Sequence, residues 1–82
     1  DPLATDGSHR YVVGPAGTVS IEVVSGKLTL VSVDTNEGWV FEVETSVPDS
    51  IEVEFERGED EAEIKVKLDD GKLEVEIKSE IN

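Results

Sequence analysis

The sequence predicts an all-β fold: a small antiparallel β-sandwich of about seven short strands, joined mostly by meander connections. Apolar and polar residues alternate over short segments, the pattern of strands with one buried and one solvated face. Turn signals separate these segments about every ten residues, a spacing typical of small sandwiches. Apolar residues at helical spacing are missing from the sequence, so we expect almost no helix.

The chain has 82 residues and a formal net charge of −13. This length fits one domain, which we place at residues 10–82 after a flexible tail at residues 1–9. The sequence has no cysteine and one histidine, which excludes disulfides and His-rich metal sites. No apolar run approaches the roughly 18 residues of a membrane span, so we expect no direct membrane insertion. Because methionine is also missing, we expect a processed form or part of a longer protein.

The first expected strands lie close to the N-terminus. Residues 10–13 form a short segment that ends at Gly14-Pro15, where proline predicts an edge strand or its end. Residues 18–24 alternate strictly and run into Ser25-Gly26, a tight-turn signal. That turn predicts two apolar pairs: Val23 with Leu28, and Ile21 with Leu30.

The third expected strand breaks its own alternation. Leu28 and Leu30 point one way, whereas Val31 and Val33 take the opposite phase. Either a β-bulge shifts the register near Leu30, or both faces of this strand are covered. A polar loop at residues 34–38 follows.

Two further strands are expected before the last hairpin. Residues 39–44 and 51–56 both alternate, and a turn at residues 47–50 separates them. A second turn at residues 57–60 leads into the final hairpin.

The final hairpin turns at Asp70-Gly71, a two-residue signal for positive φ. Folding there brings apolar residues opposite apolar ones and charges opposite their opposites, and a slip of one residue would destroy both patterns. The predicted pairs are Asp69 with Lys72, Leu68 with Leu73, Lys67 with Glu74, Val66 with Val75, Lys65 with Glu76, Ile64 with Ile77 and Glu63 with Lys78.

The inward-facing positions of these strands define the expected core. It comprises Val19, Ile21, Val23, Leu28, Leu30, Trp39, Phe41, Val43, Ile51, Val53, Phe55, Ile64, Val66, Leu68, Leu73, Val75 and Ile77.

The acidic charge suggests a class of partner. Phosphate binding needs Lys and Arg, so we expect no nucleic-acid partner. If the chain binds by charge, a protein with a basic surface is the expected partner. In the final hairpin the predicted pairs nearly balance the charge, so the unbalanced acid lies upstream, including the turn at residues 59–61. The predicted binding face comprises Glu42, Glu44, Glu52, Glu54 and Glu56. A simple hairpin at residues 57–61 would also set Glu54 opposite Glu63, a repulsive pair that a cation or another register would relieve.

A second candidate site lies in the loop at residues 34–38. Asp34, Asn36 and Glu37 supply oxygen ligands and resemble the opening of a calcium loop. The EF-hand spacing fails because position 5 is already Gly38 and position 12 is Thr45. The competing interpretation is a hairpin loop in which Asp and Asn bond their own backbone and Gly38 takes positive φ. We expect no cofactor.

Other residue types point to structure. Trp39 is in phase with Phe41, which favours core packing over a sugar-stacking platform. His9 has no partner at a useful spacing and is expected to be solvated. A small meander offers little concavity for raising a carboxyl pKa, so we expect no enzymatic activity.

Four segments carry a resemblance to a known class of modules. They read AGTVSIEV at 16–23, LTLVSV at 28–33, GWVFEV at 38–43 and IEVEF at 51–55. Together with the final hairpin, these segments resemble small uncharacterised all-β modules of secreted or membrane-tethered actinobacterial proteins. The resemblance implies extracytoplasmic placement and no chemistry. The expected function is therefore a structural or protein-interaction module of an exported protein; a calcium-binding acidic domain and an engineered β scaffold are the alternatives.

Overall fold

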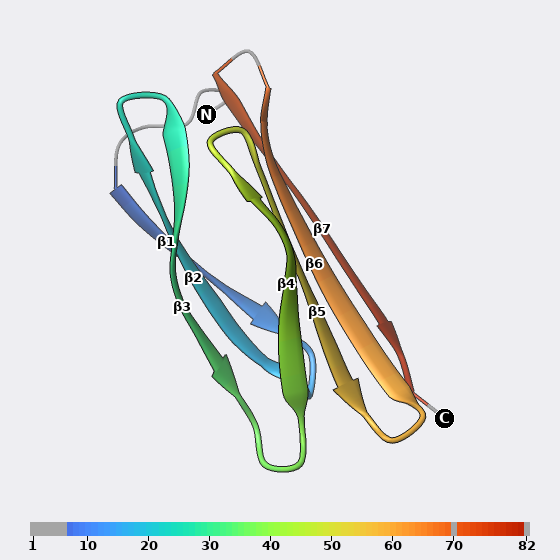
Figure 1. Cartoon of the computed structure of the whole chain (residues 1–82). Coiled ribbons are helices and arrows are strands. Elements are labelled where there is room, and N and C mark those ends of the chain that lie inside the picture. The colour runs from blue at the N-terminus through green and yellow to red at the C-terminus, as the bar shows by residue number, and fades with distance from the viewer. Residues whose placement is uncertain (1–6, 70, 82) are drawn as a thin grey trace.

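The computed structural model describes residues 7–69 and 71–81, and its regular structure in these residues is entirely β (Figure 1). The alternating segments form seven strands, which confirms the predicted fold class. No helix in the described part could cross a membrane. The strands are β1 (Gly7–Val13), β2 (Gly17–Val24), β3 (Lys27–Thr35), β4 (Val40–Val47), β5 (Ser50–Arg57), β6 (Asp60–Asp69) and β7 (Lys72–Glu80).

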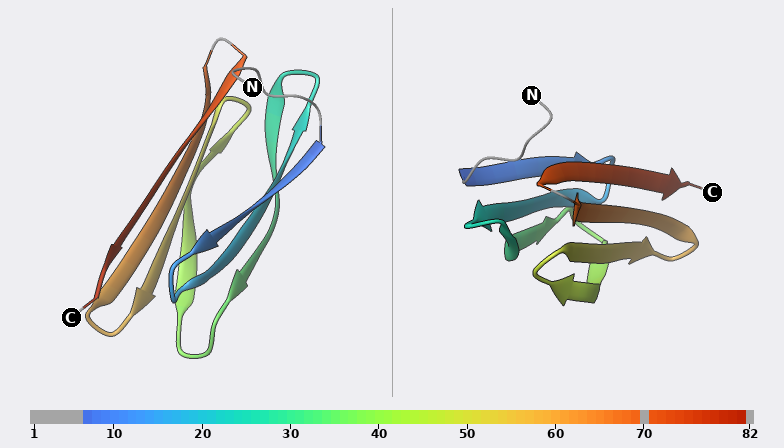
Figure 2. Two further views of the ribbon diagram at one scale, coloured as in Figure 1. Left: turned by 180° about the vertical axis from the view of Figure 1, so that it is seen from behind. Right: turned by 90° about the horizontal axis from the view of Figure 1, so that it is seen from above.

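The strands form two antiparallel sheets of consecutive neighbours, as a meander requires. One sheet has the order β1-β2-β3, and the other has the order β4-β5-β6-β7. The two sheets lie face to face: β1 lies near β6 and β7, whereas β3 lies near β4 and β5 (Figure 2). The arrangement is a sandwich of three strands on four, with the apolar core between the sheets.

The core is centred on β2, β5 and β6, whose inward apolar side chains are buried except for Leu68 at the end of β6. Ten predicted core residues are buried, and Leu30, Leu68 and Leu73 pack partly buried at the margin. The buried ten are Val19, Ile21, Val23, Leu28, Trp39, Ile51, Val53, Phe55, Ile64 and Val66. Three small or terminal core residues were not predicted: Val13, Ala16 and Ala62.

Four predicted core residues are exposed, so that part of the prediction is wrong. Phe41 and Val43 of β4 are 46% and 39% exposed, and Val75 and Ile77 of β7 are 37% and 42% exposed. All four sit on the edge strands of the larger sheet. They point to the apolar side, but a sheet of three strands does not cover a sheet of four.

The β2–β3 hairpin has the predicted register. Val23 pairs with Leu28 and Ile21 pairs with Leu30. Both turn residues, Ser25 (φ 52°) and Gly26 (φ 74°), have positive φ, as a type I′ turn requires.

A bulge explains the broken alternation of β3. Ile21 pairs with Leu30, but Ser20 already pairs with Ser32, so Val31 is the extra residue. Val31 is exposed, and after it Val33 returns to the core side. Of the two alternatives, the bulge is therefore the one that the structure shows. A second, unpredicted bulge lies in β4 at Glu44, between Val43 and Thr45.

The β6–β7 hairpin confirms all seven predicted pairs, from Asp69–Lys72 to Glu63–Lys78. Gly71 has a φ of 79°. Asp70 lies outside the described residues.

The first strand begins at Gly7, earlier than the predicted start at Arg10. Gly7, Ser8 and His9 extend the ladder because β2 is long enough to pair with them, ending at Gly7–Val23. These three residues therefore belong to the sandwich. The rest of the predicted tail, residues 1–6, lies outside the described residues.

A backbone hydrogen bond joins the two sheets. The amide of Leu28, at the start of edge strand β3, donates to the carbonyl of Pro48 in the β4–β5 turn at 2.7 Å. The next carbonyl, that of Asp49, accepts from the amide of Leu68 at 3.0 Å. The tip of the β4–β5 hairpin is thus fixed to both sheets.

Candidate functional site

The outer face of the four-stranded sheet gathers glutamates into two cross-strand rows. Glu42, Glu54 and Glu63 lie directly opposite one another on β4, β5 and β6. The second row runs from Glu56 through Glu61 to Glu80 on β5, β6 and β7. We call these residues the acidic face: Glu42, Glu54, Glu56, Glu61, Glu63 and Glu80.

Local turn chemistry sets this arrangement. Arg57 pairs with Asp60, which leaves the two-residue loop Gly58-Glu59. Gly58 has a φ of 60° and Glu59 does not have positive φ, the pattern of a type II′ turn. Because side chains alternate along a strand, this register puts glutamate opposite glutamate on the solvated side.

The acidic face alters the titration of its central residue. The pKa of Glu54 is raised above its ordinary value, foremost because its carboxyl shares a hydrogen bond with Glu56. Partial burial and the negative charges of Glu44, Glu56 and Glu61 act in the same direction. None of these three residues lies opposite Glu54: Glu56 is on the same strand, Glu61 lies diagonally on β6 and Glu44 lies in the β4 bulge. The repulsion therefore extends over three strands.

The other half of the same face is charge-balanced. Glu52 lies 3.7 Å from Lys65 Nζ and accepts a hydrogen bond of 3.0 Å from Thr45 Oγ1. Lys67 lies opposite Glu74 one step further along. The structure thus separates Glu52 from the other residues of the predicted binding face, and it places Glu44 in the β4 bulge, where no residue of β5 opposes it.

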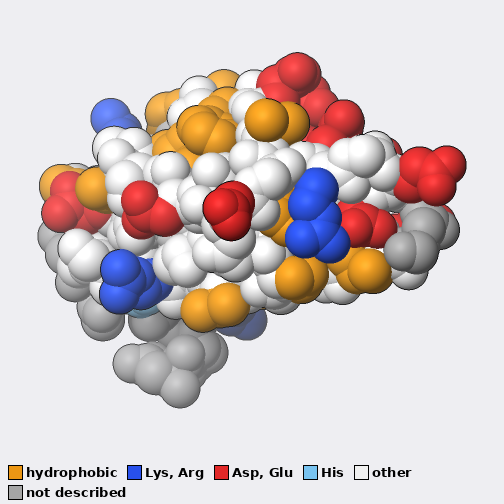
Figure 3. Space-filling view, turned by 90° about the horizontal axis from the view of Figure 1, so that it is seen from below, with side chains coloured by type: hydrophobic (Ala, Val, Ile, Leu, Met, Phe, Trp, Pro, Cys, Tyr) orange, Lys and Arg blue, Asp and Glu red, His pale blue; other side chains and the backbone are white. Residues whose placement is uncertain are grey.

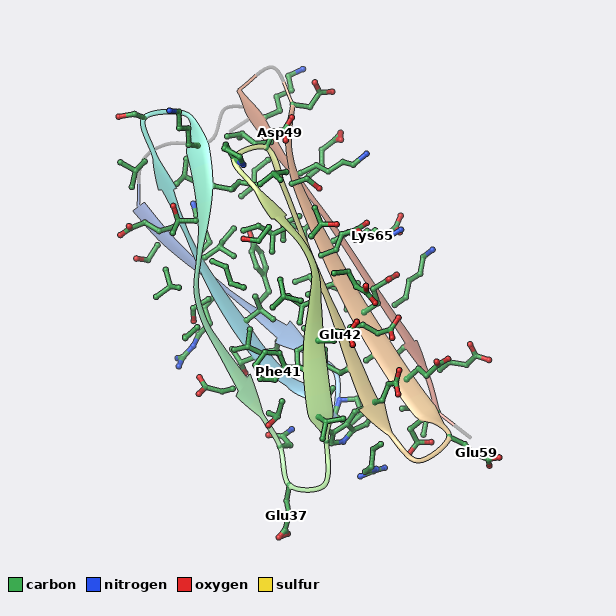
Figure 4. The ribbon with its side chains drawn as sticks, viewed as in Figure 1. Glu37, Phe41, Glu42, Asp49, Glu59 and Lys65 are labelled. Atoms are coloured by element: carbon green, nitrogen blue, oxygen red, sulfur yellow. The ribbon has the colours of Figure 1, made fainter. Side chains whose placement is uncertain are left out.

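The side-chain directions follow the pleat of the sheet. In Figure 4, Glu42 lies on the solvent side of β4, as Lys65 does on β6, whereas Phe41 lies on the opposite side toward the other sheet. Seen from the end of the sandwich, acidic side chains lie on both sides of the molecule, and those at the upper right lie beside apolar side chains (Figure 3). The acidic face therefore borders exposed apolar surface.

Cross-strand pairing brings in residues that were not on the predicted face. The predicted pair Glu54–Glu63 is confirmed. Glu61 and Glu80 join the second row, and extending the same register across residues 57–60 and into β7 would have identified them. Lys78 lies opposite Glu63, but its ion pair is with Glu76 of its own strand, at 3.3 Å.

A shallow groove of about 580 Å³ crosses this end of the sheet. Its charged lining comes from Glu54, Glu61, Glu63, Lys78 and Glu80. The groove is open to solvent along its length, unlike the concave, mostly apolar pockets that bury a small molecule. Its shape fits contact with another surface better than enclosure of a substrate.

The loop at residues 34–38 does not assemble the predicted calcium ligands. The Nδ2 of Asn36 donates to the Pro15 carbonyl at 2.7 Å, and its backbone amide donates to the Ala16 carbonyl at 2.9 Å. Glu37 points away from the body of the molecule (Figure 4). Within residues 7–69 and 71–81, no group of three or more His, Cys, Asp or Glu could hold a metal ion.

This loop is also not a hairpin loop, because it crosses from β3 in one sheet to β4 in the other. Asn36 bonds the β1–β2 turn, where the prediction had it bonding its own backbone. Gly38 does take positive φ, at 89°.

Trp39 and His9 have structural positions. Trp39 is 5% exposed, which confirms core packing, and the Arg57 guanidinium lies over its ring. His9 is half-buried in β1, so the prediction that it is solvated is wrong. Its ring stacks on Tyr11 with 6.5 Å between centroids, and its Nε2 has no hydrogen-bond partner among the described residues.

No protein-family model, curated protein or solved structure matches this chain. The resemblance to actinobacterial modules therefore stays a prediction. What the chain offers to a partner is the surface described above: an acidic face, a balanced face beside it and two edges with exposed apolar side chains.

Proposed function

We propose that this chain is a non-catalytic β module of an exported protein and that its acidic face contacts a basic surface on another protein. The observation that carries the proposal is the row Glu42–Glu54–Glu63, in which three carboxylates lie directly opposite one another. Like charges in this arrangement destabilise a sheet. A cationic partner surface would convert that cost into favourable contacts.

The neighbouring half of the sheet supports this proposal. The same strands carry Glu52 with Lys65 and Lys67 opposite Glu74, so the register allows alternating charge. Concentrating negative charge at one end of the four-stranded sheet produces a directional electrostatic field, which favours association with a surface of opposite charge. A face that served solubility alone would not need the charges to be segregated.

Other partner classes fit this surface less well. The negative charge repels nucleic acid, and the open groove does not enclose a small molecule. The exported setting comes from the sequence resemblance and is part of the proposal.

The proposal can be tested with an oligolysine peptide as the cationic probe. We would titrate it into the protein and follow backbone amide shifts by NMR and affinity by calorimetry. The test variant carries Glu42→Gln, Glu54→Gln and Glu63→Gln. The control variant carries Glu22→Gln, Glu37→Gln and Asp49→Asn, which remove the same charge at positions outside the acidic face.

We expect the largest shifts at the acidic face and a loss of affinity of about tenfold in the test variant, with a much smaller loss in the control. Equal losses in the two variants would show that net charge alone attracts the peptide, and the proposal would fail. A rise in melting temperature with millimolar calcium would instead favour a cation-binding domain.

A further inference from the structure

We propose that the outer edge of β7 pairs with β7 of a second copy of this chain. The two strands would run antiparallel about a two-fold axis at Glu76. The four-stranded sheets of the two copies would then form one continuous sheet. This inference goes beyond the proposed function and does not depend on it.

The edge of β7 is well suited to strand pairing. Each sheet has two edge strands, and two of the four, β3 and β4, carry bulges that interrupt a ladder. β7 is a regular strand of 9 residues, and its pairing with β6 shows no register shift. In the part of the chain that the structure describes, no strand pairs with its outer edge.

One register of self-pairing matches the charges along the whole length of β7. With Glu76 at the two-fold axis, Lys72 of each copy faces Glu80 of the other, and Glu74 faces Lys78. Each of these opposite-charge pairs occurs twice because of the symmetry. The remaining pair on this face is Glu76 with its own copy.

Neighbouring registers are worse. Centring on Val75 would set Lys72 opposite Lys78 and Glu74 opposite Glu76 in both halves. Centring on Ile77 would set Glu74 opposite Glu80 twice, which offsets its two Glu76–Lys78 pairs. Like charges directly opposite are destabilising, so the register centred on Glu76 is preferred.

The central Glu76 pair is compensated within each copy. Glu76 lies opposite Lys65 on β6, and the Nζ of Lys78 is 3.3 Å from its carboxylate. Two lysines per copy therefore lie near the axis, where the two carboxylates approach each other.

The inner side of β7 supplies apolar contacts in the same register. Val75 would face Ile77 of the second copy, and Ile77 would face Val75. Both side chains are exposed because the three-stranded sheet does not cover them. Pairing would extend the apolar layer across the joint and cover this surface.

The symmetry has a consequence for binding. An axis perpendicular to the sheet leaves the outer faces of both copies on the same side. The dimer would therefore present two acidic faces in one surface, which increases avidity for an extended basic partner.

Sedimentation equilibrium over a concentration series tests the pairing, at about 0.15 M salt so that the net charge is partly screened. The wild type should show a reversible monomer–dimer equilibrium. Glu74→Lys and Lys78→Glu should each weaken association by about tenfold, because each turns two opposite-charge pairs into like-charge pairs. They shift the net charge in opposite directions, so net charge cannot explain a common loss.

Two combinations should restore association. An equimolar mixture of the single variants should form the heterodimer, in which position 74 of each copy and position 78 of the other again carry opposite charges. The double variant E74K/K78E should associate like the wild type, with the same net charge. Glu37→Lys, which changes the net charge as Glu74→Lys does but lies in a distant loop, should not weaken association.

A chain that stays monomeric up to its solubility limit would overturn the inference. A dimer that is indifferent to both substitutions at positions 74 and 78 would overturn it as well, because it would use another edge. Circular dichroism of each variant checks that the sandwich is intact. Since no partner protein is present, failure here would leave the proposed function untouched.

Discussion

The guanidinium of Arg57 lies 5.0 Å from the centre of the Trp39 ring and also donates to Asp60 Oδ2, at 2.8 Å from Nη2 and 3.2 Å from Nε. One side chain thus covers the core tryptophan and closes the β5–β6 turn. Asp60 is 9% exposed, so its carboxylate depends on hydrogen bonds within the protein.

Arg57→Ala should lower the free energy of unfolding by about 1–2 kcal/mol, because the cation–π contact and a charge-assisted hydrogen bond are lost together. Urea denaturation measures the effect. Arg10→Ala removes the same charge from an exposed position on β1 and should change stability by less than about 0.5 kcal/mol. Similar losses in both variants would mean that charge matters more than these contacts.

Gly17→Ala should destabilise the fold by about 2–4 kcal/mol, because its Cβ would collide with the carbonyl oxygen of Asp34 on the paired strand β3. Gly14→Ala is the matched control: its Cβ meets open space, so only the positive φ of 51° opposes it, at about 1–2 kcal/mol. Thermal and urea unfolding compare the two. A smaller effect at Gly17 than at Gly14 would contradict the close approach of β2 and β3.

Glu54→Gln should raise the melting temperature at pH 7 and lose this advantage near pH 4. The raised pKa of Glu54 means that the folded state favours its protonated form. Its stabilising contribution is therefore present at acid pH, below the ordinary carboxyl pKa, and is lost as pH rises through the raised value. Glutamine removes the charge at every pH.

Glu52→Gln is the control for this pH dependence. Glu52 is held by Lys65 and Thr45, so its loss should lower the melting temperature at pH 7. Melting curves of both variants at pH 7 and near pH 4 test whether the effect is specific to Glu54. If both substitutions stabilise at pH 7, relief of net charge is the cause and the local arrangement is not.

Asn36→Ala should lower the free energy of unfolding by about 0.5–1.5 kcal/mol, the usual contribution of a hydrogen bond such as that to Pro15. Asn36→Asp should cost more at neutral pH, because a carboxylate oxygen would then face the Pro15 carbonyl. Glu37→Gln should have no measurable effect. Calcium-dependent stability that disappears in Asn36→Ala would show that this loop binds the ion after all.

The register of the final hairpin could be predicted because two independent patterns constrain it. A slip of one residue would set Val66 and Ile64 opposite charged residues and Lys67 opposite an apolar one. Phe41 and Ile77 show the limit of the same reasoning. Alternation defines which side of a strand is apolar, but the exposure of an edge strand depends on how far the other sheet extends, which is a tertiary property.

Irregularities were predictable only where they disturb an apolar pattern. The bulge at Val31 does so, because Leu30 and Val31 are adjacent apolar residues. The bulge at Glu44 is followed by the polar residues Thr45 and Ser46, so it interrupts no apolar alternation and leaves no comparable sign. For the acidic face, single-strand alternation identified Glu42, Glu54 and Glu56, and the charge balance pointed to the turn that contains Glu61. The place of Glu61 and Glu80 in the second row follows only from pairing across several strands.

Because of the hydrogen bond from Leu28 to Pro48, the exchange rate of one amide proton reports whether the two sheets of the sandwich are in contact. Leu28 lies at the start of an edge strand, and its outward amide finds its acceptor in the opposite sheet. Protection of this proton from exchange with deuterated solvent therefore requires that the two sheets stay together. If the Leu28 amide exchanged rapidly while the amides of β2, β5 and β6 stayed protected, the two sheets would separate locally at the contact between β3 and the β4–β5 turn.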